Sequence, residues 1–191
     1  YMMEVKAKYG DVAEAMVARK LKELPAEFSV IANVDIADRD RNSELDTVVV
    51  TPTGVIVVLE VKAGDLQADE RGRIVRDYSN GKQTDVAKQL GKQSAIARSR
   101  LAALGKNLTI RSFLVLPTGH LEGDGIGIDR NRVIDCDRFA DLCRIIRDCD
   151  RLVRAGDIPK AQIVEFLQNH CVVRLSLSSI SETLDVRTRE L

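Results

Sequence analysis

The stretch "ELDTVVVTPTGVIVVLEVKAG", residues 44–64, decides the fold of this chain. It contains two apolar runs, 46–51 and 55–62, which are predicted to be strands. Pro52 suits the second position of a type I turn, and Gly54 accepts the left-handed conformation that follows. The stretch therefore predicts a three-residue hairpin closed by a glycine bulge.

The register of this hairpin brings two acids together. If Thr51 pairs with Val55, Asp46 stands opposite Glu60, and Lys62 follows on the same face of the sheet. Two opposed carboxylates repel each other, and near apolar surroundings they take up a proton or bind a cation. A divalent metal with oxygen ligands offsets more of this charge than one lysine does. A slip of one residue in the register would move Asp46 to the other face and remove the argument.

A third carboxylate comes from the predicted helix 11–24, for which Asp11 is the expected N-cap. Glu14 lies three residues before Val17 and seven before Leu21, so it is predicted to lie on the inward apolar stripe. Glu14 is then either a metal ligand or the last residue of a capping box that begins at Asp11. The local sequence leaves both readings open.

The other charged residues also have plain structural readings. Glu60 and Lys62 could form a solvent-facing ion pair at a strand end, which contributes about 0–1 kcal/mol. Asp46 could simply end a loop. Together, however, the three residues predict a site for a hard cation with a candidate base beside it.

The remaining sequence predicts alternating strands and helices. Further strands are expected at 28–36, near Ile74-Val75, at 110–117 and at 132–136. Further helices are expected at 84–104, 137–154 and 159–169. This order predicts an α/β domain in which helices flank a central mixed sheet. At 191 residues the chain is expected to be one domain, 1–191, and the segment 130–170 either packs on the core or mediates assembly.

The formal net charge of zero conceals a segregation of charge. Residues 11–70 contain 13 acids and 6 bases, whereas residues 71–111 contain 10 bases and 2 acids. A basic block beside an acidic one is typical of a phosphate-binding face next to a cation site, although a solvated helix surface has the same pattern. The bases expected to contact a nucleic-acid backbone are Arg73, Arg76, Lys82, Lys88 and Lys92.

The cysteines and the apolar pattern predict a cytoplasmic protein. The four cysteines form no C-x-x-C pair and the two histidines stand apart, so we expect buried, reduced thiols and no zinc site. No secretory signal and no run of 18 apolar residues is present, so no membrane partner is expected. The first residue is Tyr1, which leaves open that the chain is a piece of a longer protein.

The hairpin and its acids resemble the core of the nuclease-related domain (NERD) family, a branch of the PD-(D/E)xK nucleases. That family has a helix with an acid, then Glu-Leu-Asp, a Thr-Pro-x-Gly turn, Glu-x-Lys, and a later helix with a glutamine. The likeness covers about residues 10–117 and is most specific over 44–64. In this sequence the matching residues are Glu14, Asp46, Glu60, Lys62 and Gln89.

The resemblance implies a restriction-endonuclease-like core and metal-dependent hydrolysis of phosphodiester bonds, with DNA as the expected substrate. Asp46 and Glu60, with Glu14 through water, would hold Mg²⁺ or Mn²⁺. Lys62 would position the attacking water, act as a base or stabilise charge at phosphorus. Gln89 also lies on an apolar helix stripe, so a packing role stays open.

Two other readings remain. A nucleic-acid-binding or recruitment module without turnover would bind in a salt-sensitive way and would not cut. A dimerisation domain would use the helices after residue 137, as a homo-oligomer or beside a fused partner domain. Loss of one of the acids would favour the binding module, but Glu14, Asp46 and Glu60 are all present.

Overall fold

A computed structural model describes residues 2–38, 41–77, 81, 83–105, 107–123, 127–152 and 158–173. A six-stranded sheet, in the order β10-β1-β2-β3-β7-β9, forms its centre. The strands are β1 (Ser29–Asp38), β2 (Arg41–Val50), β3 (Ile56–Val61), β7 (Ile110–Val115), β9 (Val133–Ile134) and β10 (Val172–Val173). β2 is antiparallel to β3, whereas β7 and β9 run parallel to β3.

The hairpin between β2 and β3 has the predicted register. Its four pairs run from Thr47↔Leu59 to Val50↔Ile56. At the turn, the Thr51 N–H donates to the Val55 carbonyl at 2.9 Å, and Gly54 has a φ of 93°. All six residues of β3 are buried, as expected for a central strand covered on both faces.

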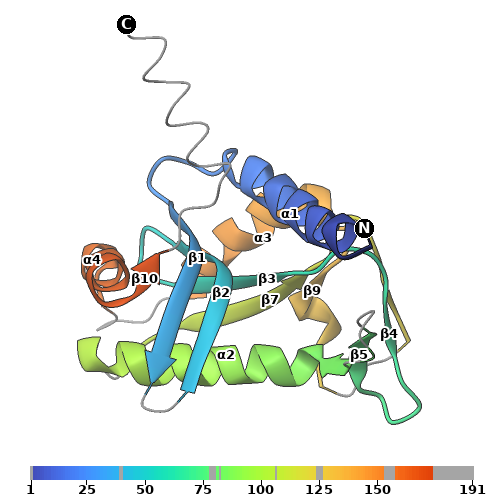
Figure 1. The fold of residues 1–191 in the computed structure, drawn as a ribbon. Coiled ribbons are helices and arrows are strands. Elements are labelled where there is room, and N and C mark those ends of the chain that lie inside the picture. The colour runs from blue at the N-terminus through green and yellow to red at the C-terminus, as the bar shows by residue number, and fades with distance from the viewer. Residues whose placement is uncertain are drawn as a thin grey trace, which may run out of the picture.

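Helices cover both faces of the sheet (Figure 1). On one face lie α1 (Met2–Leu21) and α3 (Leu142–Cys149), which pack on Val57 and Leu59. On the other face lie α2 (Val86–Leu101) and α4 (Lys160–His170), which pack on Val48 and Val58. The prediction of an α/β domain with a mixed sheet flanked by helices is confirmed. The helices after residue 137 pack on the sheet.

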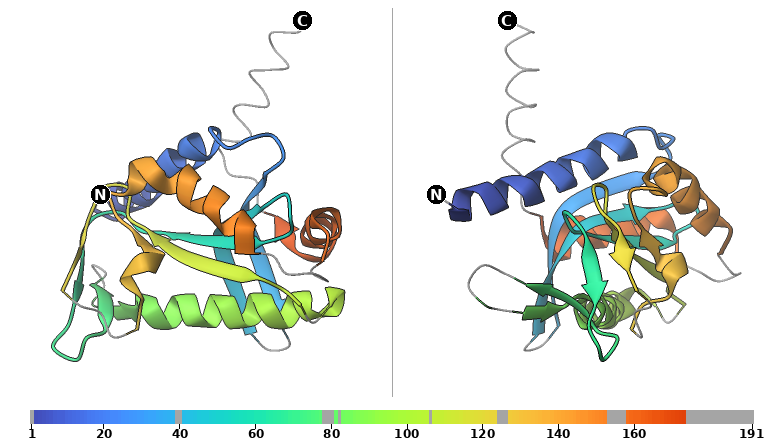
Figure 2. Two further views of the ribbon diagram at one scale, coloured as in Figure 1. Left: turned by 180° about the vertical axis from the view of Figure 1, so that it is seen from behind. Right: turned by 90° about the vertical axis from the view of Figure 1, so that its right-hand side faces the viewer.

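A small second sheet, in the order β6-β5-β4-β8, lies beside the N-terminal end of α2 (Figures 1 and 2). Its strands are β4 (Leu66–Ala68), β5 (Ile74–Asp77), β6 (Gln83–Asp85) and β8 (Leu121–Glu122). Of these, only β5 was expected from the sequence, because strands of two or three residues carry too little periodicity to be recognised. β6 leads directly into α2, whose N-cap Asp85 accepts from the Lys88 N–H at 3.1 Å.

Other boundaries differ from the predicted ones. α1 begins at Met2, so Asp11 lies inside the helix and the N-cap and capping-box predictions are wrong. The helix expected at 84–104 ends at Leu101 and continues as the 3₁₀ turn η1 (Ala102–Leu104). The helix expected at 137–154 consists of α3 between two 3₁₀ turns, η3 (Phe139–Asp141) and η4 (Asp150–Leu152). A further 3₁₀ turn, η2 (Arg130–Arg132), precedes β9. No helix in the described part of the chain is both long and apolar enough to cross a membrane.

Candidate active site

Asp46 lies where β2 and β3 separate. The last backbone pair of the hairpin is Thr47↔Leu59, one residue short of Asp46. Beyond it, the Asp46 Oδ2 accepts from the Val61 N–H at 2.8 Å. The side chain thus takes the place of a backbone partner, and its carboxylate is fixed at the fork between the two strands.

A kink in the neighbouring strand accompanies this position. On β1, Asn33 has a φ of 53° and lies between the pairs Ala32↔Thr47 and Val34↔Leu45, level with Asp46. Asparagine tolerates this left-handed conformation better than most residues do. On a regular strand, residues three apart point to opposite faces of the sheet. Leu45 and Val48 nevertheless belong to the same core cluster, so the alternation of side chains along β2 is interrupted between them. The left-handed residue Asn33 and the acid Asp46 therefore lie at the same level of the sheet, where β1 and β2 have no regular pair.

Glu60 is the most deeply buried acid of the site, with 1% of its surface exposed. Its Oε1 accepts from Lys62 Nζ and, at 2.7 Å, from Gln89 Nε2. Its Oε2 accepts from Gln93 Nε2 at 2.6 Å. A buried carboxylate needs such donors, because an unpaired charge in the interior is costly. Gln89, for which a packing role was left open, therefore contacts the site directly.

Gln93 is a site residue that the sequence analysis missed. It is buried, and its Nε2 also donates to the Glu44 carbonyl at 2.9 Å. Its position four residues after Gln89 places both glutamines on one face of α2, and this spacing is the signal that could have identified it. Within the described part of the chain, the Gln93 Oε1 is buried without a hydrogen-bond partner.

The pKa of Asp46 is raised from its ordinary value of 3.8 to about 7. Burial is the main cause, and the charge of Glu60 is the next. Lys62 and the Val61 N–H act in the opposite direction, whereas Glu14 raises the pKa slightly further. The predicted repulsion between Asp46 and Glu60 is therefore present, and Lys62 offsets only part of it.

Glu14 differs from its predicted position. The buried stripe of α1 consists of Ala13, Val17 and Leu21, whereas Glu14 is exposed, so its placement on the inward stripe was wrong. It lies near enough to Asp46 to influence its pKa. Among the described residues, however, Glu14, Asp46 and Glu60 do not bring three oxygen atoms within 4.8 Å of one another.

A groove of about 430 Å³ lies beside Gln89. It is lined by Arg73, Lys88 and Lys92, three of the five bases predicted to contact a nucleic-acid backbone. Arg73 also pairs with Asp69, at 2.7 Å. Arg76 is not part of the lining, and Lys82 falls outside the described residues. The fold thus places a basic groove next to the helix face that holds Glu60.

Comparison with known families gives one match. The model of the nuclease-related domain matches residues 9–117, which is more than half of the chain. Searches of curated proteins and of solved structures found no significant match. The matched range includes the hairpin, all of α2 and the five residues that carry the family pattern. The mixed sheet flanked by helices is consistent with a restriction-endonuclease-like fold. The chain therefore belongs to the nuclease-related domain family.

Proposed function

We propose that the protein is a metal-dependent nuclease that hydrolyses phosphodiester bonds, with DNA as its substrate. The observation that carries this proposal is the pair Asp46 and Glu60, two acids that interact within a largely buried site beside Lys62. Such a pair raises the free energy of the folded chain unless a proton or a cation compensates it. The adjacent basic groove supplies the attraction for a phosphate backbone.

The residues of the site fit a hard divalent cation. Asp46 and Glu60 offer carboxylate oxygens, and the Gln93 Oε1 is a neutral buried acceptor on the side chain whose Nε2 donates to Glu60. Mg²⁺ binds such oxygen ligands and keeps several waters, so two carboxylates suffice. We assign the metal to Asp46 and Glu60, with Glu14 acting through water because it is exposed.

A bound Mg²⁺ or Mn²⁺ would polarise a phosphoryl oxygen and lower the pKa of a bound water. Lys62 is the cationic donor next to Glu60 and would orient the attacking water or stabilise charge at phosphorus. Gln89 and Gln93 keep the Glu60 carboxylate in one orientation. Lys88 and Lys92 would hold the backbone without reading its sequence.

The proposal is tested with single- and double-stranded DNA and with RNA, in the presence of Mg²⁺, Mn²⁺ or EDTA. Glu60→Gln and Lys62→Met are each expected to lower the cleavage rate by about 100-fold or more. Glu165→Gln, a substitution of an acid on α4 outside the site, is the matched control and should cut like the parent chain. Cleavage that persists in EDTA, or that both site variants retain, would refute the assignment.

A second candidate is a nucleic-acid-binding module without turnover. It is favoured by the hydrogen bonds of Glu60, which has donors on both oxygens within the protein itself. This function predicts salt-sensitive binding of DNA that neither Mg²⁺ nor Glu60→Gln alters, and no cleavage. The nuclease also predicts salt-sensitive binding, but it predicts cleavage that requires Mg²⁺ and is lost in Glu60→Gln.

A further inference from the structure

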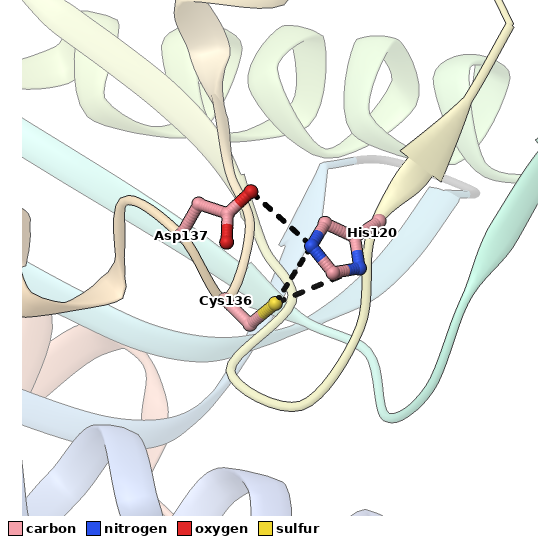
Figure 3. Close-up of side chains that lie close together, drawn as sticks. All are labelled: His120, Cys136 and Asp137. Carbon is pink, nitrogen blue, oxygen red and sulfur yellow. Dashed lines mark hydrogen bonds and ion pairs between the residues drawn. The ribbon is translucent and has the colours of Figure 1, made fainter.

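A second cluster of metal-binding side chains lies apart from the acids of the hairpin. His120, Cys136 and Asp137 each offer one ligand atom, and these atoms all lie within 4.8 Å of one another. Figure 3 shows the three side chains converging from two loops. The expectation of no zinc site rested on spacing in the sequence, whereas the fold joins two loops that are distant in sequence and brings His120 next to Cys136.

The topology explains why these loops meet. β3, β7 and β9 are parallel neighbours, so their carboxyl ends lie at one edge of the sheet. Asp65 follows β3, His120 follows β7, and Cys136 with Asp137 follows β9. The residues of the cluster and the neighbouring Asp65 thus come from the ends of three adjacent strands.

Backbone contacts hold the loops together. The Cys136 N–H donates to the Gly119 carbonyl at 3.0 Å, and the Leu66 N–H donates to the His120 carbonyl at 2.9 Å. Gly119 lies so close to the next loop that a Cβ on it would be 2.1 Å from the Gly64 carbonyl oxygen. The ligand groups are thereby positioned by the main chain, and ordering them on binding costs less conformational entropy.

The distances fit a tetrahedral metal. His120 Nε2 lies 3.1 Å from the Cys136 Sγ and 3.2 Å from the Asp137 Oδ2. Zinc bonds of the usual length at tetrahedral angles separate such ligand atoms by roughly 3.4–3.6 Å. The same sulfur lies 3.6 Å from His120 Nδ1, so it stands beside the ring and not along the Nε2 lone pair. A rotation of the imidazole, together with an expansion of a few tenths of an ångström, would therefore admit the ion. Thiolate, imidazole and carboxylate together are typical zinc ligands, whereas Mg²⁺ takes oxygen almost alone.

We propose that His120 Nε2, the Cys136 thiolate and the Asp137 Oδ2 bind one Zn²⁺ ion, with water in the fourth position. Binding forms a zinc–sulfur bond and releases the thiol proton to solvent. Asp65 lies on the other side of the imidazole, with its Oδ1 3.9 Å from Nδ1 and 2.8 Å from the His120 backbone nitrogen. It fixes the His120 backbone by a hydrogen bond and places a negative charge on the Nδ1 side of the ring, beyond hydrogen-bond distance.

The charges around Cys136 favour a metal over a nucleophilic thiol. Asp135 and Asp137 flank Cys136 in the sequence, and the Asp65 carboxylate lies on the Nδ1 side of the neighbouring His120 ring. A reactive cysteine needs cationic surroundings that lower its pKa. A divalent cation would relieve this concentration of negative charge, so the surroundings suit a ligand.

Co²⁺ is the spectroscopic probe for this site. The parent chain is expected to show a thiolate-to-cobalt charge-transfer band, which Zn²⁺ abolishes on displacing Co²⁺ and Mg²⁺ does not. Cys136→Ala and His120→Ala should lose the band, whereas Cys171→Ala, a substitution of a buried cysteine outside the cluster, should retain it. Asp65→Asn should weaken Zn²⁺ binding by roughly tenfold.

The cobalt band tests this site separately from the proposed nuclease activity. Asp46→Asn removes a ligand of the hairpin site and should leave the cobalt band intact. As a second measurement, mass spectrometry can follow the alkylation of Cys136 by iodoacetamide, which Zn²⁺ is expected to slow. Absence of the band in the parent chain, or its survival in Cys136→Ala, would overturn the proposal. Rapid alkylation of Cys136 that Zn²⁺ does not slow would overturn it as well.

Discussion

Replacing Asp46 by asparagine should stabilise the fold at alkaline pH and abolish the response of stability to Mg²⁺. The amide oxygen of the introduced side chain can still accept from the Val61 N–H, as the carboxylate does at 2.8 Å, so the substitution mainly removes a charge. The pKa of Asp46 is about 7 in the folded chain against an ordinary 3.8. The folded state therefore binds more protons than the unfolded state between these values.

The sign and size follow from proton linkage. Where the folded state holds the extra proton, stability falls as the pH rises, by about 1.4 kcal/mol per pH unit. The Asp46 contribution is thus favourable at low pH and is lost as the pH rises towards the folded pKa of about 7. Between pH 5 and 8 this amounts to at most about 3 kcal/mol, and solvent screening of the partly buried carboxylate reduces it to on the order of 2 kcal/mol.

Urea denaturation of both chains at pH 5, 6, 7 and 8 measures the difference. The advantage of Asp46→Asn should grow with pH by about 2 kcal/mol. At pH 8, Mg²⁺ at about 100 times its dissociation constant should stabilise the parent chain by about 2.7 kcal/mol and leave the variant unchanged. Asp69→Asn is the control, because the Arg73 N–H lowers the pKa of Asp69 and its effect is constant over this range. A difference between Asp46→Asn and the parent chain that does not vary with pH, or an equal response to Mg²⁺, would contradict the reasoning.

Three further perturbations test the scaffold. Gly54→Ala should lower the free energy of unfolding, measured by urea denaturation, by about 2 kcal/mol or more, because φ is 93° and a Cβ would lie 2.3 Å from a backbone oxygen. Gly91→Ala is the control, because Gly91 is an exposed helix residue with open space around it, and should raise this free energy by about 1 kcal/mol. Equal effects would show that the turn is not strained. The double substitution Lys88→Gln, Lys92→Gln should reduce the slope of log K against log salt concentration for DNA binding by about 1.8, measured by fluorescence anisotropy. An unchanged slope would exclude the groove as the DNA-binding surface. Gln93→Leu should lower the free energy of unfolding at pH 7.5 by about 1.5–3 kcal/mol in urea denaturation, because the Glu60 carboxylate loses a hydrogen-bond donor. An unchanged free energy would show that this hydrogen bond does not stabilise the fold.

The hairpin could be predicted because its determinants are local. The turn residues fix the reversal, and the reversal fixes every pair that follows, so the register from Thr47 to Val50 came from the sequence alone. The family pattern added Gln89, whose contact with Glu60 has no local signal.

The missed features depend on contacts between distant segments. Gln93 becomes a site residue only once α2 is laid across β3. The kink at Asn33 is set by the pairing of two strands, and its residue type alone did not reveal it. His120 and Cys136 meet because β7 and β9 are neighbours, which no spacing in the sequence records. The early start of α1 was missed because Gly10 and Asp11 resemble a helix boundary.

The two pairs of polar residues on α2 restrict how this helix can vary. Lys88 and Lys92 form one row along it, and Gln89 and Gln93 form the next row, offset by about 100°. Inserting a single residue just before Lys88 would turn the rest of the helix by that angle and bring the ammonium groups to the place of the amides. Single substitutions on α2 can therefore be tolerated, whereas a one-residue insertion or deletion would move the lysines proposed to contact phosphate and remove the glutamine hydrogen bonds to Glu60 together.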